Sequence, residues 1–490
     1  MTANRNRAAR RHRRGDADAA WTRRQVMVTS STLMLGACSR PGRSNTPASG
    51  TPMSTTSPAA PGQAAGRSRV AVIGAGMAGL ACAAHLCARG VEVVVLEARG
   101  RLGGRIHTSH AWRDVPIDLG ASWIHGRTGN PIADLARRAR ARTVSTSYDS
   151  AELYIAPGLR AAGFHRPDTA RWENLVGEAA RMAERADRDV SLDRAIGSAL
   201  DGEALTATER VDLAFYLHAT YEAEWGLEVA RISARTADDG KSFGGEDVLF
   251  PDGYEATPAQ LARGVDIRTG EHVHQIRHGE AGATVVTGAR EHAVAAVVLT
   301  VPLAVLRHGT IAVSPDLPAA SRAALEVIGV GVLGKTFLRF PSAFWPAAVD
   351  WHEYVAPENR WTEWVSLAKT GPPVLLGFSV GDHARWTESA PERDVVEQAM
   401  VAVRAMFGVT VPSPVAVQRS TWAADPLARG SYTSNGVGTT RDDRVTLAQP
   451  QGARLVLAGE ATEPDYFGTV HGAYLSGIRA AEQVRRVLGQ

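Results

Sequence analysis

The sequence predicts an α/β fold, and three observations support that prediction. An apolar run of strand length at residues 70–73 leads directly into a glycine-rich segment at residues 74–79. A helical pattern follows over residues 80–89, and a second apolar run occupies residues 91–96. Apolar side chains make up 44% of the 490 residues, which is enough to fill large cores. A chain of this length is expected to form two or three domains.

The glycine-rich segment reads Gly-Ala-Gly-Met-Ala-Gly and matches the GxGxxG fingerprint of a dinucleotide-binding strand–turn–helix. Gly74 permits the tight turn, Gly76 lets the backbone approach a pyrophosphate, and Gly79 lets helix and strand pack closely. The helix N-terminus offers N–H groups and a positive dipole end to the phosphates. Glu97 ends the second strand and is expected to accept hydrogen bonds from an adenosine ribose. This βαβ unit predicts a Rossmann-like domain.

The formal net charge of +3 arises at one end of the chain. Residues 1–37 contain eight Arg against Asp16 and Asp18, and the rest of the chain has 46 Lys and Arg against 49 Asp and Glu. The body of the protein therefore has no basic excess of the kind that nucleic-acid binding requires. We expect no nucleic-acid partner.

The first 66 residues are interpreted as an export signal, residues 1–37, and a flexible linker, residues 38–66. Arg23 and Arg24 precede a short apolar run that resembles the core of a twin-arginine signal and is too short to span a bilayer. Leu-Gly-Ala-Cys at residues 35–38 resembles a bacterial lipoprotein cleavage site, so Cys38 is the expected lipidation site. The alternative is a disordered basic tail. The signal predicts a protein held at the outer face of a bacterial cell membrane by its lipid anchor alone.

Three segments after Glu97 resemble the flavin-containing amine oxidase family. Residues 98–105 read Ala-Arg-Gly-Arg-Leu-Gly-Gly-Arg, residues 120–126 read Gly-Ala-Ser-Trp-Ile-His-Gly, and residues 468–473 read Gly-Thr-Val-His-Gly-Ala. The likeness spans nearly all of residues 68–488 and is closest to the polyamine oxidase branch at Trp-Ile-His-Gly. It implies an α/β fold in which a Rossmann-like FAD-binding domain is interwoven with an α+β substrate-binding domain.

The resemblance also implies which residues hold FAD. Arg105 is expected on the pyrophosphate, Val273 at the adenine and Glu460 at the ribityl chain. A helix that opens at residues 468–473 is expected to face the carbonyl edge of the flavin, where its dipole would stabilise the reduced ring. The full set of expected FAD contacts is Gly74, Gly76, Gly79, Glu97, Gly103, Gly104, Arg105, Gly120, Ala121, Ser122, Trp123, Val273, Trp422, Gly459, Glu460, Gly468, Thr469 and Val470.

Lys335 is the foremost catalytic candidate. The chain has 51 Arg and only three Lys, and Lys335 lies within an apolar, strand-like run at residues 330–338. A buried ammonium is costly unless it is paired or loses its proton. The resemblance implies that this lysine holds a water against flavin N5 and assists reoxidation by oxygen. The alternative is a lysine on an edge strand that points into solvent.

Tyr432 matches an aromatic residue that walls the amine site beside the flavin in this family, and an aromatic face suits an amine or its cation. The family often has a second aromatic residue opposite, where this chain has Thr469, which predicts a more open cage. Trp422 is expected to pack along the flavin, and for either aromatic side chain a plain core role is the alternative. Ser431 stands where some relatives have a cysteine that attaches FAD covalently, so FAD is expected to be non-covalent.

His125 follows the flavin segment and could accept a proton from the amine, hydrogen-bond the amine, or be structural. Glu222 and Glu224 are candidates for binding a distal ammonium, and an exposed helix face is the alternative for at least one of them. Cys82 and Cys87 lie in one predicted helix and are interpreted as structural thiols, with no disulfide framework.

The expected FAD domain comprises residues 68–135, 226–315 and 418–490, and the expected substrate domain comprises residues 136–225 and 316–417. The first insertion is expected to be mainly helical, and the second to contain strands near residues 337–340 and 374–380. No metal site is expected, and the sequence carries no signal for a particular oligomeric state.

The predicted reaction is FAD-dependent oxidation of an amine by hydride transfer from the α-carbon to flavin N5, and a substrate of the polyamine type is expected. The imine product is hydrolysed, and oxygen is reduced to hydrogen peroxide. The rival hypotheses are an L-amino-acid oxidase, which needs a cation to clamp the carboxylate, and a desaturase, which shares the N-terminal fingerprint. A catalytically quiet flavoprotein at the cell surface is a third alternative.

Overall fold

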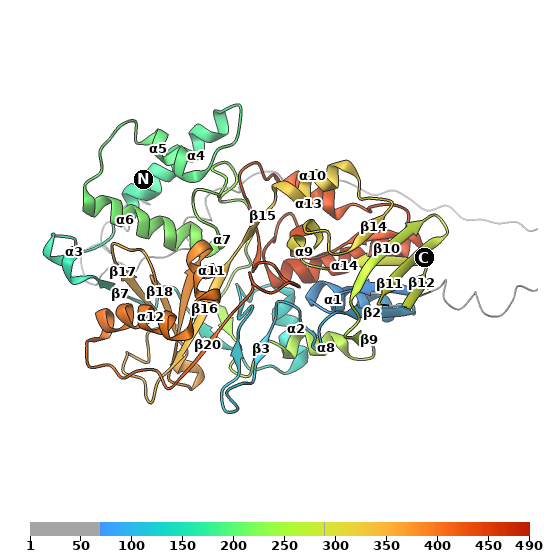
Figure 1. The fold of residues 1–490 in the computed structure, drawn as a ribbon, viewed down its shortest axis with the longest axis horizontal. Coiled ribbons are helices and arrows are strands. Elements are labelled where there is room, and N and C mark those ends of the chain that lie inside the picture. Colours follow the sequence, from blue (N-terminus) through green and yellow to red (C-terminus); the bar gives the residue numbers. More distant parts are fainter. Residues whose placement is uncertain (1–68, 289) are drawn as a thin grey trace, which may run out of the picture.

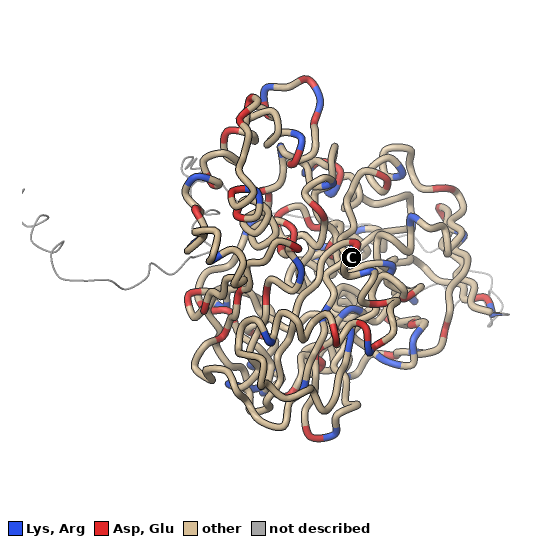
Figure 2. The backbone as a smooth tube through the Cα atoms, turned by 60° about the vertical axis from the view of Figure 1, so that its left-hand side comes forward, with Lys and Arg blue, Asp and Glu red and all other residues tan. Residues whose placement is uncertain are grey.

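The computed structural model describes residues 69–288 and 290–490, which form two lobes joined along a broad contact (Figure 1). The predicted export signal, Cys38 and the predicted linker lie outside the described residues. Within the described part of the chain, no helix combines the length and the apolar character needed to cross a bilayer. Basic and acidic residues alternate along the backbone of both lobes (Figure 2).

The first lobe is built on a parallel five-stranded sheet in the order β22-β13-β1-β2-β9. Its strands are β1 (Val70–Ile73), β2 (Val93–Glu97), β9 (Asp266–Thr269), β13 (Ala296–Leu299) and β22 (Leu455–Leu457). Strands β1, β2, β13 and β22 are buried along their whole length, as their unbroken runs of Val, Leu and Ile require in a sheet covered on both faces. The predicted βαβ unit is confirmed, with its helix α1 at Met77–Cys87.

A four-stranded sheet in the order β12-β11-β10-β14 extends the first lobe. Its strands are β10 (Val273–Gly279), β11 (Gly282–Thr287), β12 (Arg290–Val294) and β14 (Ala312–Ser314). The C-terminal helix α14 (Val470–Val487) packs against α1 beside the parallel sheet (Figure 1). Helices α2 (Pro131–Ala139), α8 (Ala256–Ala262), α9 (Leu303–Arg307) and α13 (Arg441–Ala448) complete this lobe.

The second lobe contains a six-stranded sheet in the order β20-β16-β19-β18-β17-β7. Its strands are β7 (Ala151–Ile155), β16 (Leu333–Arg339), β17 (Trp351–Val355), β18 (Glu363–Ser366), β19 (Val374–Val380) and β20 (Ala416–Arg419). Strands β16 and β19 confirm the strands expected in the second insertion. Because β7 comes from the first insertion and pairs with β17 from the second, one sheet joins both insertions. The predicted interwoven α/β fold is confirmed.

Helices complete the second lobe around that sheet (Figure 1). They are α3 (Pro157–Ala161), α4 (Thr169–Arg185), α5 (Leu192–Ala199), α6 (Ala207–Leu217), α7 (Ala223–Trp225), α11 (Gly381–Ser389) and α12 (Glu392–Phe407). A short π-helix at His218–Glu222 links α6 to α7. The helices of the first insertion share a core with residues 227–237, whereas α10 (Ala319–Val327) packs into the core of the first lobe. The structure therefore places residues 227–237 in the second lobe and α10 in the first. The sequence predicted the reverse, with residues 226–315 in the FAD domain and residues 316–417 in the substrate domain.

Short strand pairs form the junction of the lobes. Strand β15 (Gly329–Gly331) pairs with β21 (Tyr432–Ser434), and β3 (Thr108–Ser109) pairs with β4 (Ile117–Asp118). A three-stranded sheet combines β5 (Trp123–Ile124), β8 (Asp247–Leu249) and β6 (Val144–Thr146). The segments expected to surround the flavin therefore converge where the two lobes meet.

Gly477 tests the packing of α1 on α14. A Cβ at Gly477 would lie 2.2 Å from the carbonyl oxygen of Ala78, so Gly477→Ala should force the two helices apart. We expect a loss of about 1–3 kcal/mol in the free energy of unfolding, measured by urea denaturation. Gly197→Ala, in α5, is the matched control because nothing lies near its Cβ position and alanine favours a helix. Equal stability of the two variants would contradict close helix packing at Gly477.

Candidate active site

One continuous cavity runs from the carboxyl ends of the parallel strands β1 and β2 to the second lobe. This is where open parallel sheets bind their ligands. The cavity wall includes all but one of the residues expected to contact FAD and also Lys335, Tyr432 and His125. The exception, Gly79, is buried against the turn: a Cβ there would lie 2.0 Å from the carbonyl oxygen of Gly74. Gly79 thus serves helix–strand packing, as its place in the fingerprint requires.

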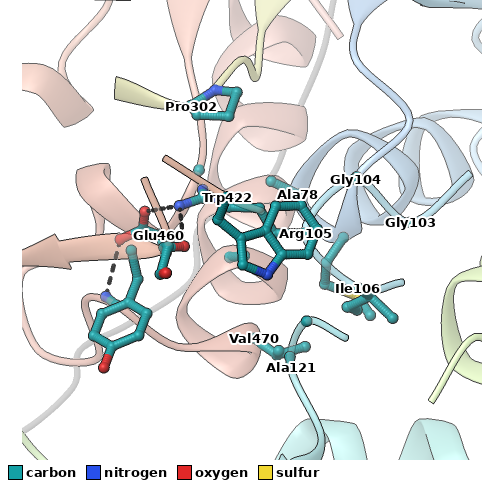
Figure 3. A pocket seen from close by; sticks show the side chains of 18 of the residues that line it. Ala78, Gly103, Gly104, Arg105, Ile106, Ala121, Pro302, Trp422, Glu460 and Val470 are labelled. Atoms are coloured by element: carbon teal, nitrogen blue, oxygen red, sulfur yellow. Dashed lines mark hydrogen bonds and ion pairs between the residues drawn. The ribbon is translucent and has the colours of Figure 1, made fainter. Parts of the chain in front are cut away.

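Three glycine segments form a cradle with no room for side chains. Gly76 and Gly103 form an isolated parallel bridge, and a Cβ on Gly104 would lie 3.3 Å from the Cα of Gly76. A Cβ on Gly120 would lie 1.9 Å from the carbonyl oxygen of Arg105. The cradle wall is thus bare backbone, as close approach of a pyrophosphate requires. Figure 3 shows Gly103 and Gly104 beside Arg105 and Trp422 in this wall.

Glu97 stabilises the turn of the cradle. Its side chain is buried and accepts hydrogen bonds from the backbone N–H of Ala75 at 2.7 Å and of Arg99 at 2.8 Å. Glu97 and Ala98 line the cavity. It is also lined by Val273, the first residue of β10, and by His272 just before it. The two residues expected at the adenosine half of FAD are therefore brought to one cavity.

Arg105, which is partly exposed, and the buried Glu460 form a charge network on the opposite wall. Arg105 Nη1 donates to Glu460 Oε1 at 2.8 Å, and Glu460 Oε2 accepts from Thr433 Oγ1 at 2.6 Å and from Gly468 N at 3.0 Å. Figure 3 shows Arg105 and Glu460 pointing toward each other. Arg444, 1% exposed, donates to Thr433 Oγ1 at 2.9 Å. Burial alone would raise the pKa of the Glu460 carboxyl, but Arg105 and the hydrogen bonds lower it overall.

Lys335 projects from a strand that is paired on both sides, because β16 lies between β19 and β20. The edge-strand alternative is therefore excluded. Its Nζ donates to the carbonyl oxygen of Gly120 and to Ser122 Oγ, both at 2.5 Å, and lies 5.3 Å from the ring centroid of Trp123. Lys335 is 7% exposed, and burial lowers the pKa of its ammonium to about 8 although Asp118 opposes the change.

Tyr432 stands at the junction of the lobes. Its hydroxyl donates to the carbonyl oxygen of Glu224 at 3.0 Å, and burial raises its pKa well above the usual value. Trp225 and Phe467 stack with ring centroids 5.3 Å apart and line the same cavity. Thr469 caps α14 by accepting from Gly472 N at 2.9 Å. Thr469 thus brings no aromatic ring to the cavity, and the wall there includes the Trp225–Phe467 pair.

An aromatic chamber continues the cavity into the second lobe. Trp351 stacks on Tyr148 with centroids 4.5 Å apart, and Trp123 and Phe378 each lie 6.1 Å from Trp351. Glu363, 1% exposed, also lines the cavity. Sequence reasoning missed Tyr148, Trp351, Phe378 and Glu363 because they come from separate strands and a loop. The tryptophans at residues 351, 361 and 364 were the available signal for an aromatic cluster.

The remaining candidates divide between the cavity and the scaffold. His125 lines the cavity, its Nδ1 lies 3.1 Å from Asp247 Oδ2, and its ring stacks with that of Trp123. Trp422 lines the cavity and donates from Nε1 to the carbonyl oxygen of Leu119 at 2.9 Å. Glu224 lines the cavity, whereas Glu222 lies 3.0 Å from His218 Nδ1 and accepts from Val229 N.

Neither cysteine of the described residues lines the cavity. Cys82 and Cys87 both lie in α1, and burial raises the pKa of both thiols. Ser431 lines the cavity, and its hydroxyl accepts from Leu333 N at 3.0 Å. No group of His, Cys, Asp and Glu side chains suited to a metal ion occurs among residues 69–288 and 290–490.

A bare-backbone cradle at the sheet edge, joined to a chamber of aromatic rings, is the architecture of a cofactor-dependent oxidoreductase. A family model described as flavin containing amine oxidoreductase matches residues 77–485. The chain belongs to this family, so its cofactor is a flavin and its substrate class is amines.

Curated relatives agree with that assignment. The chain is 32% identical to polyamine oxidase 4 of Oryza sativa subsp. japonica over 442 residues, which covers 86% of this chain and 90% of the relative. It is also 32% identical over 440 residues to lysine-specific histone demethylase 1 homolog 1 of Arabidopsis thaliana, which covers 85% of this chain. The chain spans only 52% of that demethylase homologue, about half its length.

Solved structures share the fold. Putrescine oxidase bound to putrescine superposes with a TM-score of 0.70 and 19% sequence identity, covering 86% of this chain and 99% of the other. At that identity the likeness concerns the fold alone.

The Arg105–Glu460–Thr433 network predicts the effect of removing its carboxylate. Glu460→Ala would leave the buried Arg444 and the partly exposed Arg105 without their nearby negative charge, so we expect a loss of about 3 kcal/mol in unfolding free energy. Flavin absorbance after gel filtration should fall in parallel. Glu460→Gln should lose less because it keeps an acceptor for Arg105. Glu463→Ala serves as the control, and a Glu460→Ala protein with unchanged stability and flavin content would refute the role of the network.

Proposed function

We propose that this protein is an FAD-dependent amine oxidase that acts on diamines or polyamines. The observation that carries the proposal is the buried Lys335 at the boundary between the glycine cradle and the aromatic chamber. A single cavity thus joins a surface suited to a dinucleotide, a buried amine and a chamber suited to an organic cation.

The cradle fits FAD on the grounds of backbone geometry and charge. Gly76, Gly103 and Gly104 would allow the pyrophosphate to approach the backbone, and Arg105 would bring a guanidinium near it. Glu97 and Val273 would hold the adenosine, and Glu460 the ribityl chain. With Ser431 at the cavity wall and both described cysteines in α1, binding would be non-covalent.

FAD supplies the redox chemistry when bound: it removes a hydride from the carbon next to the amine nitrogen and is reoxidised by oxygen, giving an imine and hydrogen peroxide. The protein supplies orientation and desolvation. Tyr432, Trp225 and Phe467 would hold the reacting amine by their ring faces and exclude water around it. Lys335 would hold a water molecule at the cofactor and assist reoxidation.

Two carboxylates support a substrate with a second amino group. Glu363 is buried in the chamber wall and Glu224 lies in the cavity wall beside Trp225. A carboxylate at the far end of an apolar chamber attracts an ammonium that aromatic rings alone would hold weakly. His125 would hydrogen-bond the substrate amine, oriented by Asp247.

The rival substrate classes are less well supported. An amino-acid oxidase needs a cation for the substrate carboxylate, but the arginines of the described cavity wall are Arg99 and Arg105. Arg99 pairs with Asp425 and Arg105 with Glu460, both on the cradle side. The export signal and the lipid anchor at Cys38 would place this activity at the outer face of the cell membrane.

Anaerobic mixing tests the proposed function. The purified flavoprotein is mixed with putrescine, spermidine, tyramine, tryptamine and several L-amino acids while the visible flavin absorbance is followed. We expect bleaching by putrescine or spermidine that reverses on admitting oxygen, with peroxide formed. Bleaching by amino acids alone would overturn the substrate class, and bleaching by none of these compounds would overturn the proposed oxidase.

Glu363 should determine the preference for diamines. Glu363→Gln removes the charge but keeps the shape, so the apparent Kd of a diamine for the enzyme should rise by roughly tenfold or more, about 1.4 kcal/mol. A monoamine of similar length should be affected much less. Glu358→Gln, on the exposed surface, is the control. An equal loss for both amines would refute recognition of the distal ammonium by Glu363.

A further inference from the structure

A polar cluster lies behind the wall of the aromatic chamber, where β16 of the second lobe meets the loop after β4. Lys335 Nζ donates to the carbonyl oxygens of Gly120 at 2.5 Å and Asp118 at 3.4 Å, and to Ser122 Oγ at 2.5 Å. Two of the three protons of the charged ammonium therefore have close acceptors, at Gly120 and Ser122, and the contact with Asp118 is long. The loop that walls the cofactor cradle is thus attached to the other lobe by one ammonium group.

The Asp118 carboxylate is held from the opposite side. Its Oδ1 accepts from Thr108 Oγ1 at 2.5 Å, and both carboxylate oxygens accept from the backbone N–H of Tyr254, at 3.1 and 3.2 Å. These bonds hold the charge in place near Lys335 without using the ammonium protons. A buried carboxylate fixed in this way acts on the ammonium through space.

The two charges depend on each other. Burial raises the pKa of the Asp118 carboxyl to about 6, while Thr108, Tyr254 and Lys335 oppose the rise and Glu255 adds to it. The Lys335 ammonium faces Asp118 and the ring of Trp123, and of these Asp118 favours its charged form. Each of the two charges therefore favours the charged form of the other.

The pair also lies between two cavities. Lys335 borders the main cavity, Asp118 borders a second one, and Ser122 and Trp123 line both. The second cavity is also lined by Asp114, Arg142 and Asp252, which are exposed at the surface. Asp118 is thus placed on a route from solvent that is separate from the amine chamber.

We propose that Asp118 is a positioning residue: its carboxylate, bordering the second cavity, keeps Lys335 charged and hydrogen-bonded to residues 118–122 at the cofactor. This inference adds to the proposed function a residue that controls the charge of Lys335. It requires only that the ammonium and the carboxylate interact in the folded protein.

The small number of lysines makes the proposal directly measurable. The chain contains Lys241, Lys335 and Lys369, so labelling lysine with ¹³C at Cε yields three signals, which Lys241→Arg and Lys369→Arg assign. The flavoprotein is titrated by NMR as wild type, as Asp118→Asn and as Asp252→Asn, the matched control at the mouth of the second cavity. We expect Asp118→Asn to lower the Lys335 midpoint by about one pH unit or more. Asp252→Asn should leave it unchanged.

An unchanged Lys335 midpoint in folded, flavin-bound Asp118→Asn would overturn the proposal. If that variant does not fold, Thr108→Val is used, because it keeps the carboxylate but removes its hydrogen bond from Thr108. It should shift the midpoint in the same direction by a smaller amount, and no shift would equally overturn the proposal. Because NMR requires no turnover, failure of the oxidase assignment and failure of this proposal are separate results.

Discussion

The attachment of Lys335 to residues 118–122 is the interaction on which the site depends. It joins the central sheet of the second lobe to the loop that walls the cofactor cradle, and it places the only buried lysine of the described chain between two cavities. A hydrophobic contact could hold the lobes together but would not fix the register of a loop. Two short, directed hydrogen bonds from one charged group do so, because each needs its acceptor in place.

On the opposite wall of the cradle, the Glu460 carboxylate likewise joins separate segments of the chain. Glu460 gathers Arg105, Thr433 and the N–H of Gly468, which come from three separate segments of the chain. Burying these charges is tolerable only because each has a partner. The cradle is therefore rigid where it would meet a phosphate, and its rigidity comes from side chains that also carry the charge the cofactor requires.

Local patterns were sufficient for the strand–turn–helix unit of the first lobe. The strand, the glycine turn and the helix at residues 70–87 are specified by neighbours in sequence, so the dinucleotide fingerprint located them together. Motif likeness was also sufficient to gather Lys335, Tyr432 and Trp422 into one cavity. It could not place Glu222 and Glu224, two residues apart, because the π-helix brings one to His218 and helix α7 brings the other to the cavity wall.

The sequence by itself determined the cofactor class, the interwoven α/β fold and the lysine at the site, because each depends on short segments with strict steric or chemical demands. Only the tertiary structure decided the shape of the substrate chamber. Tyr148, Trp351, Glu363 and Phe378 come from three strands and a loop, and their meeting depends on strand order in the six-stranded sheet. The sequence also could not predict that Asp118 and Lys335 interact. They are far apart in the chain, and a charge acts through space on whatever group the fold brings near it.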